Sequence, residues 1–208
     1  MRYCVSVNRQ QDKQLDDLKN LHEEKVSKYI DNFSDLVREF VVEIRNKHIT
    51  EKLYIYPILE CVNQIIFSFR EFKEARNREP DSIEKISSTL EETSKKELAM
   101  VFVFFLNAKA FLELADRHTK VKIKDNYDLF RDIKKIRDLL VHFYEKEVEE
   151  RKFFISLVIQ RGLGDLSELE MRDIYTKESE SVYFSTDLFY FSLKDIFEEI
   201  KNDPQSLR

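Results

Sequence analysis

The chain has 208 residues but contains only 2 glycines, 3 prolines and 2 cysteines, and it has no tryptophan. Folds rich in β-strands and doubly wound α/β folds need many glycine- and proline-containing turns, so this scarcity argues against both classes. It favours a few long helices joined by short breaks. Hydrophobic residues make up 42% of the sequence, which is enough to bury a core and to exclude global disorder.

The two cysteines, Cys4 and Cys61, form no CxxC motif and no disulfide framework, a usage typical of a reducing compartment. Residues 1–10 lack the apolar stretch of a signal peptide. The most apolar run, residues 98–106, is too short to cross a bilayer and is expected to be a buried helix segment. These features predict a cytoplasmic protein with no membrane contact.

Charge is heavy but balanced, with 36% charged residues and a net charge of −5. Proteins that coat nucleic acids are usually basic, so any RNA contact in this chain has to be local. The sequence has no HExxH zinc motif, no Glu-x-x-His pair of the di-iron bundles and no Walker-type phosphate loop. We therefore expect neither a metal nor another cofactor.

Apolar residues recur at helical spacing in five stretches, each of which predicts a helix: residues 12–45, 50–76, 81–115, 125–160 and 185–203. Ser185 suits the N-cap of the last helix. Between the last two helices the chain is polar, with a break at Gly162 and Gly164. Ser167 and Glu170 suit the start of a short helix there.

Long helices joined by short breaks predict an all-α fold. We expect an antiparallel up-and-down bundle of four or five long helices with a C-terminal helical extension. The bundle is assigned to residues 1–160. Residues 161–208 are expected to form a loop and a C-terminal helix that packs on the same domain.

The most informative segment is residues 136–144, with the sequence Ile-Arg-Asp-Leu-Leu-Val-His-Phe-Tyr. Four residues separate Arg137 from His142, and Asp138 directly follows the arginine. At about 100° per residue, Arg137 flanks the apolar stripe of the helix, while Asp138 and His142 form an i,i+4 pair on the polar side. That stripe comprises Ile133, Ile136, Leu140, Phe143 and Tyr144.

These residue types suit RNA cleavage without a metal. His142 can act as the base that takes the 2′-hydroxyl proton, and Arg137 can stabilise the charge that develops on phosphorus. Asp138 could orient the imidazole or raise its pKa. The non-catalytic alternative is that His142 is an exposed surface histidine paired with Asp138.

The segment resembles the signature of the HEPN superfamily, in which an arginine is followed by a polar residue and, after four residues, by a histidine. Tyr144, two residues after His142, further resembles the tyrosine of HEPN toxins that are paired with nucleotidyltransferase antitoxins. Those toxins often carry asparagine where Asp138 stands. The specific match covers about eight residues.

The resemblance implies a metal-independent HEPN endoribonuclease that leaves 2′,3′-cyclic phosphate ends, in the manner of a toxin or a phage-defence effector. It also implies a homodimer that builds one composite cleft from two motifs. Tyr144 would then be the residue that a partner nucleotidyltransferase silences by attaching adenylate. Because Tyr144 lies on the apolar stripe, a simple core role is the alternative.

Basic residues lie just upstream of the motif, and Lys122, Lys124 and Lys134 are the candidates for holding the RNA backbone. Alternatively, these lysines form a solvated surface that offsets nearby acids. A different function also stays open. The chain could be a catalytically inactive HEPN-like bundle that serves as a protein-interaction or nucleotide-binding module, since an acid beside Arg137 weakens phosphate affinity.

Overall fold

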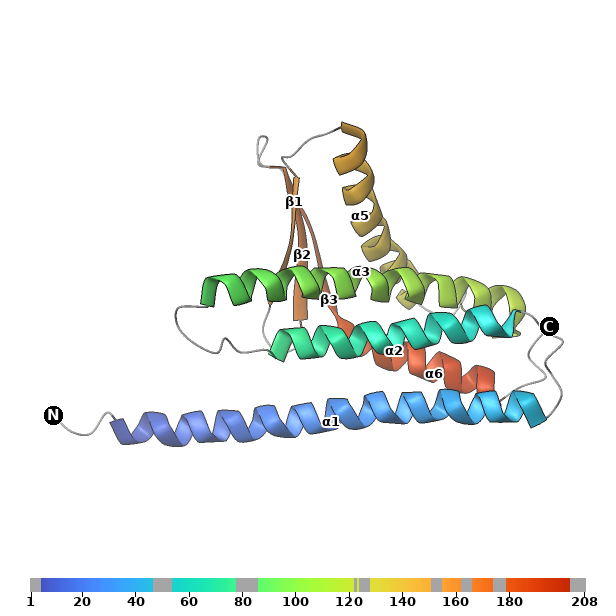
Figure 1. The fold of residues 1–208 in the computed structure, drawn as a ribbon, viewed down its shortest axis with the longest axis horizontal. Coiled ribbons are helices and arrows are strands. Elements are labelled where there is room, and N and C mark those ends of the chain that lie inside the picture. Colours follow the sequence, from blue (N-terminus) through green and yellow to red (C-terminus); the bar gives the residue numbers. More distant parts are fainter. Residues whose placement is uncertain are drawn as a thin grey trace. The chain divides into compact units, whose positions relative to one another are not determined.

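A computed structural model describes the backbone of residues 5–46, 54–77, 86–121, 123, 128–150, 155–161, 166–173 and 179–202. Side chains are described for residues 24–46, 54–77, 93–121, 123, 128–141, 166–169 and 182–202. The helices are α1 Val5–Asn46, α2 Ile55–Asn77, α3 Ile86–His118, α5 Asp128–Glu150 and α6 Thr186–Asn202. Helices dominate the described residues, which confirms the predicted all-α helical bundle (Figure 1).

The chain forms two compact units, Met1–Glu43 and Ile44–Arg208. The first unit consists of most of α1, a helix of 42 residues. All other helices and strands belong to the second unit, and so does the candidate motif. The second unit therefore carries the functional argument.

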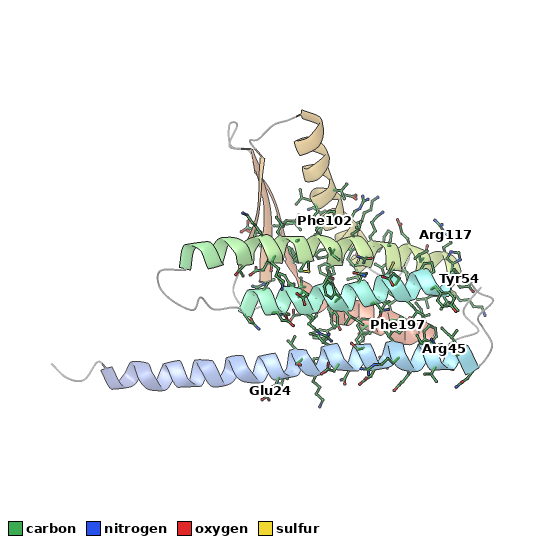
Figure 2. All side chains as sticks on the ribbon, viewed as in Figure 1. Glu24, Arg45, Tyr54, Phe102, Arg117 and Phe197 are labelled. Carbon is green, nitrogen blue, oxygen red and sulfur yellow. The ribbon has the colours of Figure 1, made fainter. Side chains whose placement is uncertain are left out.

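Helices α2 and α3 pack against each other as an antiparallel pair. At one end of the pair the Tyr54 ring stacks on His118, with ring centroids 4.6 Å apart. Toward the other end Lys96 of α3 forms a 2.6 Å ion pair with Glu71 of α2. Figure 2 labels Tyr54 and Arg117 at the same end of the two helices. The apolar stripe of α2 is buried, as its periodicity predicts.

Helix α3 also contacts α5 and the first strand, so it is the central helix of this unit. Val101, Phe104 and Phe105 are fully or almost fully buried, whereas Leu106 is 40% exposed, so the predicted apolar run is buried only in part. The apolar stretch is longer than residues 98–106. By length and composition alone, Thr93–His118 could span a membrane, a property that central helices of soluble proteins share. Cytoplasmic localisation stays a prediction.

The region after α5 differs from the prediction. Instead of continuing to residue 160, α5 ends at Glu150, and three strands follow: β1 Ile155–Arg161, β2 Leu166–Asp173 and β3 Ser179–Ser185. They form an antiparallel sheet in the order β1-β2-β3, in which Leu169 lies opposite Ile159 and Val182. Neither the loop nor the short helix expected at Ser167 and Glu170 is present, because both residues belong to β2.

The sheet lies against the central helix. The side chains of Ser167 and Leu169 on β2 and of Phe184 on β3 are buried. Phe105 of α3 meets the ring of Phe184 edge-on, with centroids 5.3 Å apart. Since β1 also contacts α5, the sheet and α5 stand together beside α3 and rise steeply from it (Figure 1).

A buried ion pair joins α2 to the start of α6. Lys73 Nζ lies 2.5 Å from Asp187 Oδ1, and the two side chains are only 10% and 7% exposed. Phe69, one turn before Lys73, stacks on Tyr190 of α6 with centroids 4.0 Å apart. The backbone N–H of Leu188 donates to Ser185 Oγ at 3.3 Å, which confirms the predicted N-cap.

One turn further along α2, Arg76 binds the sheet. Its Nη1 donates to Ser167 Oγ at 2.8 Å, and its Nη2 donates to the carbonyl oxygen of Leu166 at 3.1 Å. The last turns of α2 thus hold both the beginning of β2 and the beginning of α6. The position of the sheet depends on these polar contacts as well as on aromatic packing.

Replacing Lys73 with methionine should lower the free energy of unfolding by about 3–5 kcal/mol, because Asp187 would be left as a buried charge without its cation. The double variant Lys73→Met/Asp187→Leu should recover much of this loss. Urea denaturation followed by far-UV circular dichroism measures both. Lys194→Met, which removes a more exposed i,i+4 pair with Glu198, is the control and should cost less than about 1 kcal/mol. Equal losses in Lys73→Met and Lys194→Met would contradict a special role for the buried pair.

Candidate functional site

The candidate motif lies on α5, a continuous helix that begins with Asp128 in its first turn. Ile133, Ile136, Leu139 and Leu140 are buried and form the face that packs on α3 and β1. Ile133, Ile136 and Leu140 were predicted for this face, and Leu139 widens it. The backbone of α5 extends through position 144, so the whole motif lies on one helix.

Arg137 lies at the edge of the buried face, as its position beside the stripe predicts. Its side chain is 30% exposed, and its Nη1 donates to Asp138 Oδ1 at 2.8 Å. Arg137 Nε is buried and has no hydrogen-bond partner among the described residues. The guanidinium is therefore held between the core and solvent, with a carboxylate on one side.

Asp138 is 32% exposed, and its described partner is the arginine next to it in sequence. The predicted i,i+4 pairing of Asp138 with His142 falls partly outside the described residues, because the side chain at 142 is not described. The same holds for Tyr144. Both positions are placed only as part of the α5 backbone. Their catalytic and regulatory roles remain predictions.

Of the three candidate RNA-binding lysines, Lys134 is exposed on α5, while Lys122 and Lys124 lie outside the described residues. Arg131, one turn before Lys134 and Lys135, forms ion pairs with Asp128 at 3.2 Å and with Asp132 at 3.5 Å. Positive charge on this surface is thus partly neutralised by acids of the same helix. Lys134 can contact a phosphate only as part of a mixed-charge surface.

The described residues offer little other chemistry of the kinds considered from sequence. Within them, no three His, Cys, Asp or Glu side chains gather as a group that could hold a metal ion. Cys61 is a free, half-buried thiol on α2. Its burial raises the pKa of the thiol above its usual value, and the negative charge of Glu60 adds to this shift. A thiol that resists ionisation is a poor nucleophile, which argues against Cys61 as a catalytic residue.

Alkylation should report this raised pKa. In a Cys4→Ser variant, Cys61 is the only cysteine, so the rate of its reaction with iodoacetamide follows its thiolate fraction. A raised pKa shifts ionisation to higher pH, so we expect the rate in the native protein to keep rising beyond about pH 9. In guanidinium chloride the alkylation rate of the same thiol should stop rising once the pH passes its ordinary pKa of about 8.5. A native profile that levels off at the same pH as the unfolded one would contradict the shift.

Comparisons of the chain with protein-family models, with curated proteins and with solved structures found no match. The HEPN resemblance therefore rests on the motif of α5 alone.

Proposed function

We propose that the protein is a metal-independent endoribonuclease of the HEPN type that acts as a homodimer. The observation that carries the proposal is the placement of Arg137. Its guanidinium is partly exposed at the edge of the packed face of α5, five positions before His142 on the same continuous helix. A planar guanidinium at such an edge is suited to bidentate hydrogen bonding with two oxygens of a phosphate.

The proposed reaction needs only an acid–base group and a cation. His142 takes the proton of a ribose 2′-hydroxyl, the 2′-oxygen attacks the adjacent phosphorus, and the bond from phosphorus to the 5′-oxygen breaks. The protonated His142 gives up its proton to solvent water, which protonates the leaving 5′-oxygen, and the product end is a 2′,3′-cyclic phosphate. Arg137 stabilises the charge on the phosphorus oxygens during this exchange.

The HEPN resemblance implies the homodimer, and helix geometry is compatible with it. Arg137 and His142 are five residues apart, so their side chains leave the helix axis about 140° apart. A single copy of α5 cannot easily direct both at one phosphate. Two copies around a two-fold axis can, because the arginine of one subunit then faces the histidine of the other.

The motif also carries a proposal for regulation. We propose that a nucleotidyltransferase partner attaches adenylate to Tyr144 and thereby silences the enzyme. The protein would in that case act as a toxin or a phage-defence effector. This part rests on the resemblance of His142-x-Tyr144 alone.

A second candidate function is favoured by one specific contact. The ion pair of Arg137 with Asp138 leaves the arginine electrically compensated, which suits a structural role better than a phosphate grip. In that case the bundle is catalytically inactive and serves as a protein-interaction or nucleotide-binding module. RNA cleavage distinguishes the two functions directly.

The first test incubates purified protein with total RNA and tRNA in EDTA and maps the cleaved ends. Wild type should cleave and leave 2′,3′-cyclic phosphates. His142→Ala and Arg137→Ala should each slow cleavage at least about 100-fold, since removing a general base or an oxyanion donor has effects of that order. His22→Ala and Arg131→Ala are the controls, because they remove an imidazole and an exposed arginine elsewhere. Folded, dimeric wild type that leaves RNA intact would shift the assignment to the inactive module.

Mixing two inactive variants tests the composite site. If Arg137 of one subunit works with His142 of the other, an Arg137→Ala/His142→Ala heterodimer keeps one complete site and one empty site. Random exchange of subunits makes about half of the dimers heterodimers, so the mixture should recover about a quarter of the wild-type rate. A mixture as inactive as its two components, with exchange confirmed by differently tagged subunits, would argue that both residues act within one chain.

A further inference from the structure

The contact between Arg137 and Asp138 joins two residues that are adjacent on a helix. Adjacent side chains leave the helix axis about 100° apart and do not normally face each other. The arginine nevertheless turns toward its neighbour, and Nη1 donates to Asp138 Oδ1 at 2.8 Å. Both side chains are about two-thirds buried, at 30% and 32% exposure, so solvent screens the pair less than it screens a surface pair.

The same contact restricts how Arg137 can bind a phosphate. A guanidinium offers two edges for bidentate binding, one made by Nε and an Nη group and the other by the two Nη groups. Nε is buried, so the first edge is not accessible to an incoming anion in this arrangement. Nη1 is engaged by the carboxylate, so the second edge is already shared with a negative charge. A phosphate that binds through both Nη groups therefore has to share Nη1 with the negative charge of Asp138.

We infer that Asp138 acts as a built-in counter-ion that competes with RNA phosphate for Arg137, and that this competition sets the affinity of the site for RNA. The inference rests on the proposed function and deepens it. It assigns to Asp138 the weakening of phosphate affinity that an acid beside Arg137 suggests, and not the other role expected from sequence, which was to orient His142. Asp138 is thus a residue that tunes binding through Arg137 and takes no part in the chemical step.

Two other features of α5 agree with this role. Arg131 is also paired with acids, at 3.2 Å and 3.5 Å, but its side chain is 74% exposed and solvent screens its contacts strongly. Arg137 is less exposed to solvent than Arg131, so a neighbouring carboxylate has a larger effect on its affinity for phosphate. Lys134 is exposed one turn away, where its positive charge would add attraction for RNA.

The test measures RNA binding separately from cleavage. The probe is a fluorescent single-stranded RNA whose riboses are all 2′-O-methylated, so that it cannot be cleaved by attack of the 2′-oxygen. Asp138→Asn keeps the shape and an acceptor oxygen but removes the charge. We expect it to lower the Kd about five-fold or more, since a unit charge about 4 Å away has roughly that effect even with the screening of bulk water. The slope of log affinity against log salt should steepen by about 0.7, as for one more phosphate contact on a single strand.

Asp132→Asn is the matched control, because it removes one negative charge from the same helix and should change the Kd less than about two-fold. Asp138→Asn should also lose its effect when Arg137 is alanine, since the competition needs the guanidinium. Equal gains in Asp138→Asn and Asp132→Asn would overturn the inference, because net charge alone would explain them.

Two further outcomes separate this inference from the proposed function. An unchanged Kd with slower cleavage in Asp138→Asn would overturn the inference while keeping the ribonuclease, and would support the role of Asp138 in orienting His142. A wild type and variants that neither bind the probe nor cleave natural RNA would overturn both. Tighter binding by Asp138→Asn without any cleavage would keep the competition for phosphate but remove the catalytic function.

Discussion

Helix α3 is apolar on more than one side, and the second unit is arranged so that neighbouring elements cover each of these sides. Consecutive rings show the constraint. Phe104 lies 6.3 Å from Phe69 of α2, whereas Phe105 lies 5.3 Å from Phe184 of β3. Because one helix must be covered from two directions, α2 and the sheet stand on different sides of it. Helix α5 contacts the same helix, and this contact determines which residues of the motif stay near solvent.

Much of the helical architecture could be predicted from sequence, because helix packing imposes a period that the residues display. The stripe of α2 and the Ser185 cap are examples, and both are present. The strands were not predicted because the sequence pattern of β2 is compatible with a helix as well as with a strand. Leu166 and Leu169 are three residues apart, and Ser167 with Glu170 imitates a capping box. The pairing of β2 with β1 and β3 outweighs this local preference for a helix.

In the candidate motif, the position of Arg137 on the helix was predictable from sequence but its contact was not. Periodicity correctly placed Arg137 at the edge of the core face, because that depends only on the turn of the helix. The pairing of Arg137 with Asp138 depends on side-chain rotamers and on how deeply α5 packs, which a sequence pattern does not contain. The buried pair of Lys73 and Asp187 was missed for a related reason, since its members are 114 positions apart in the chain.

These two ion pairs lie in different parts of the second unit and differ in how deeply they are buried. Lys73 and Asp187 are buried, and their charges serve the junction of α2 with α6. Arg137 is only partly buried, but a guanidinium beside the core still needs a nearby negative charge, which Asp138 supplies. If the protein binds RNA as proposed, the carboxylate that makes the arginine compatible with packing is also the group that opposes phosphate at the same atoms. Stability and RNA affinity would then be coupled through one residue, and a change that improves one would weaken the other.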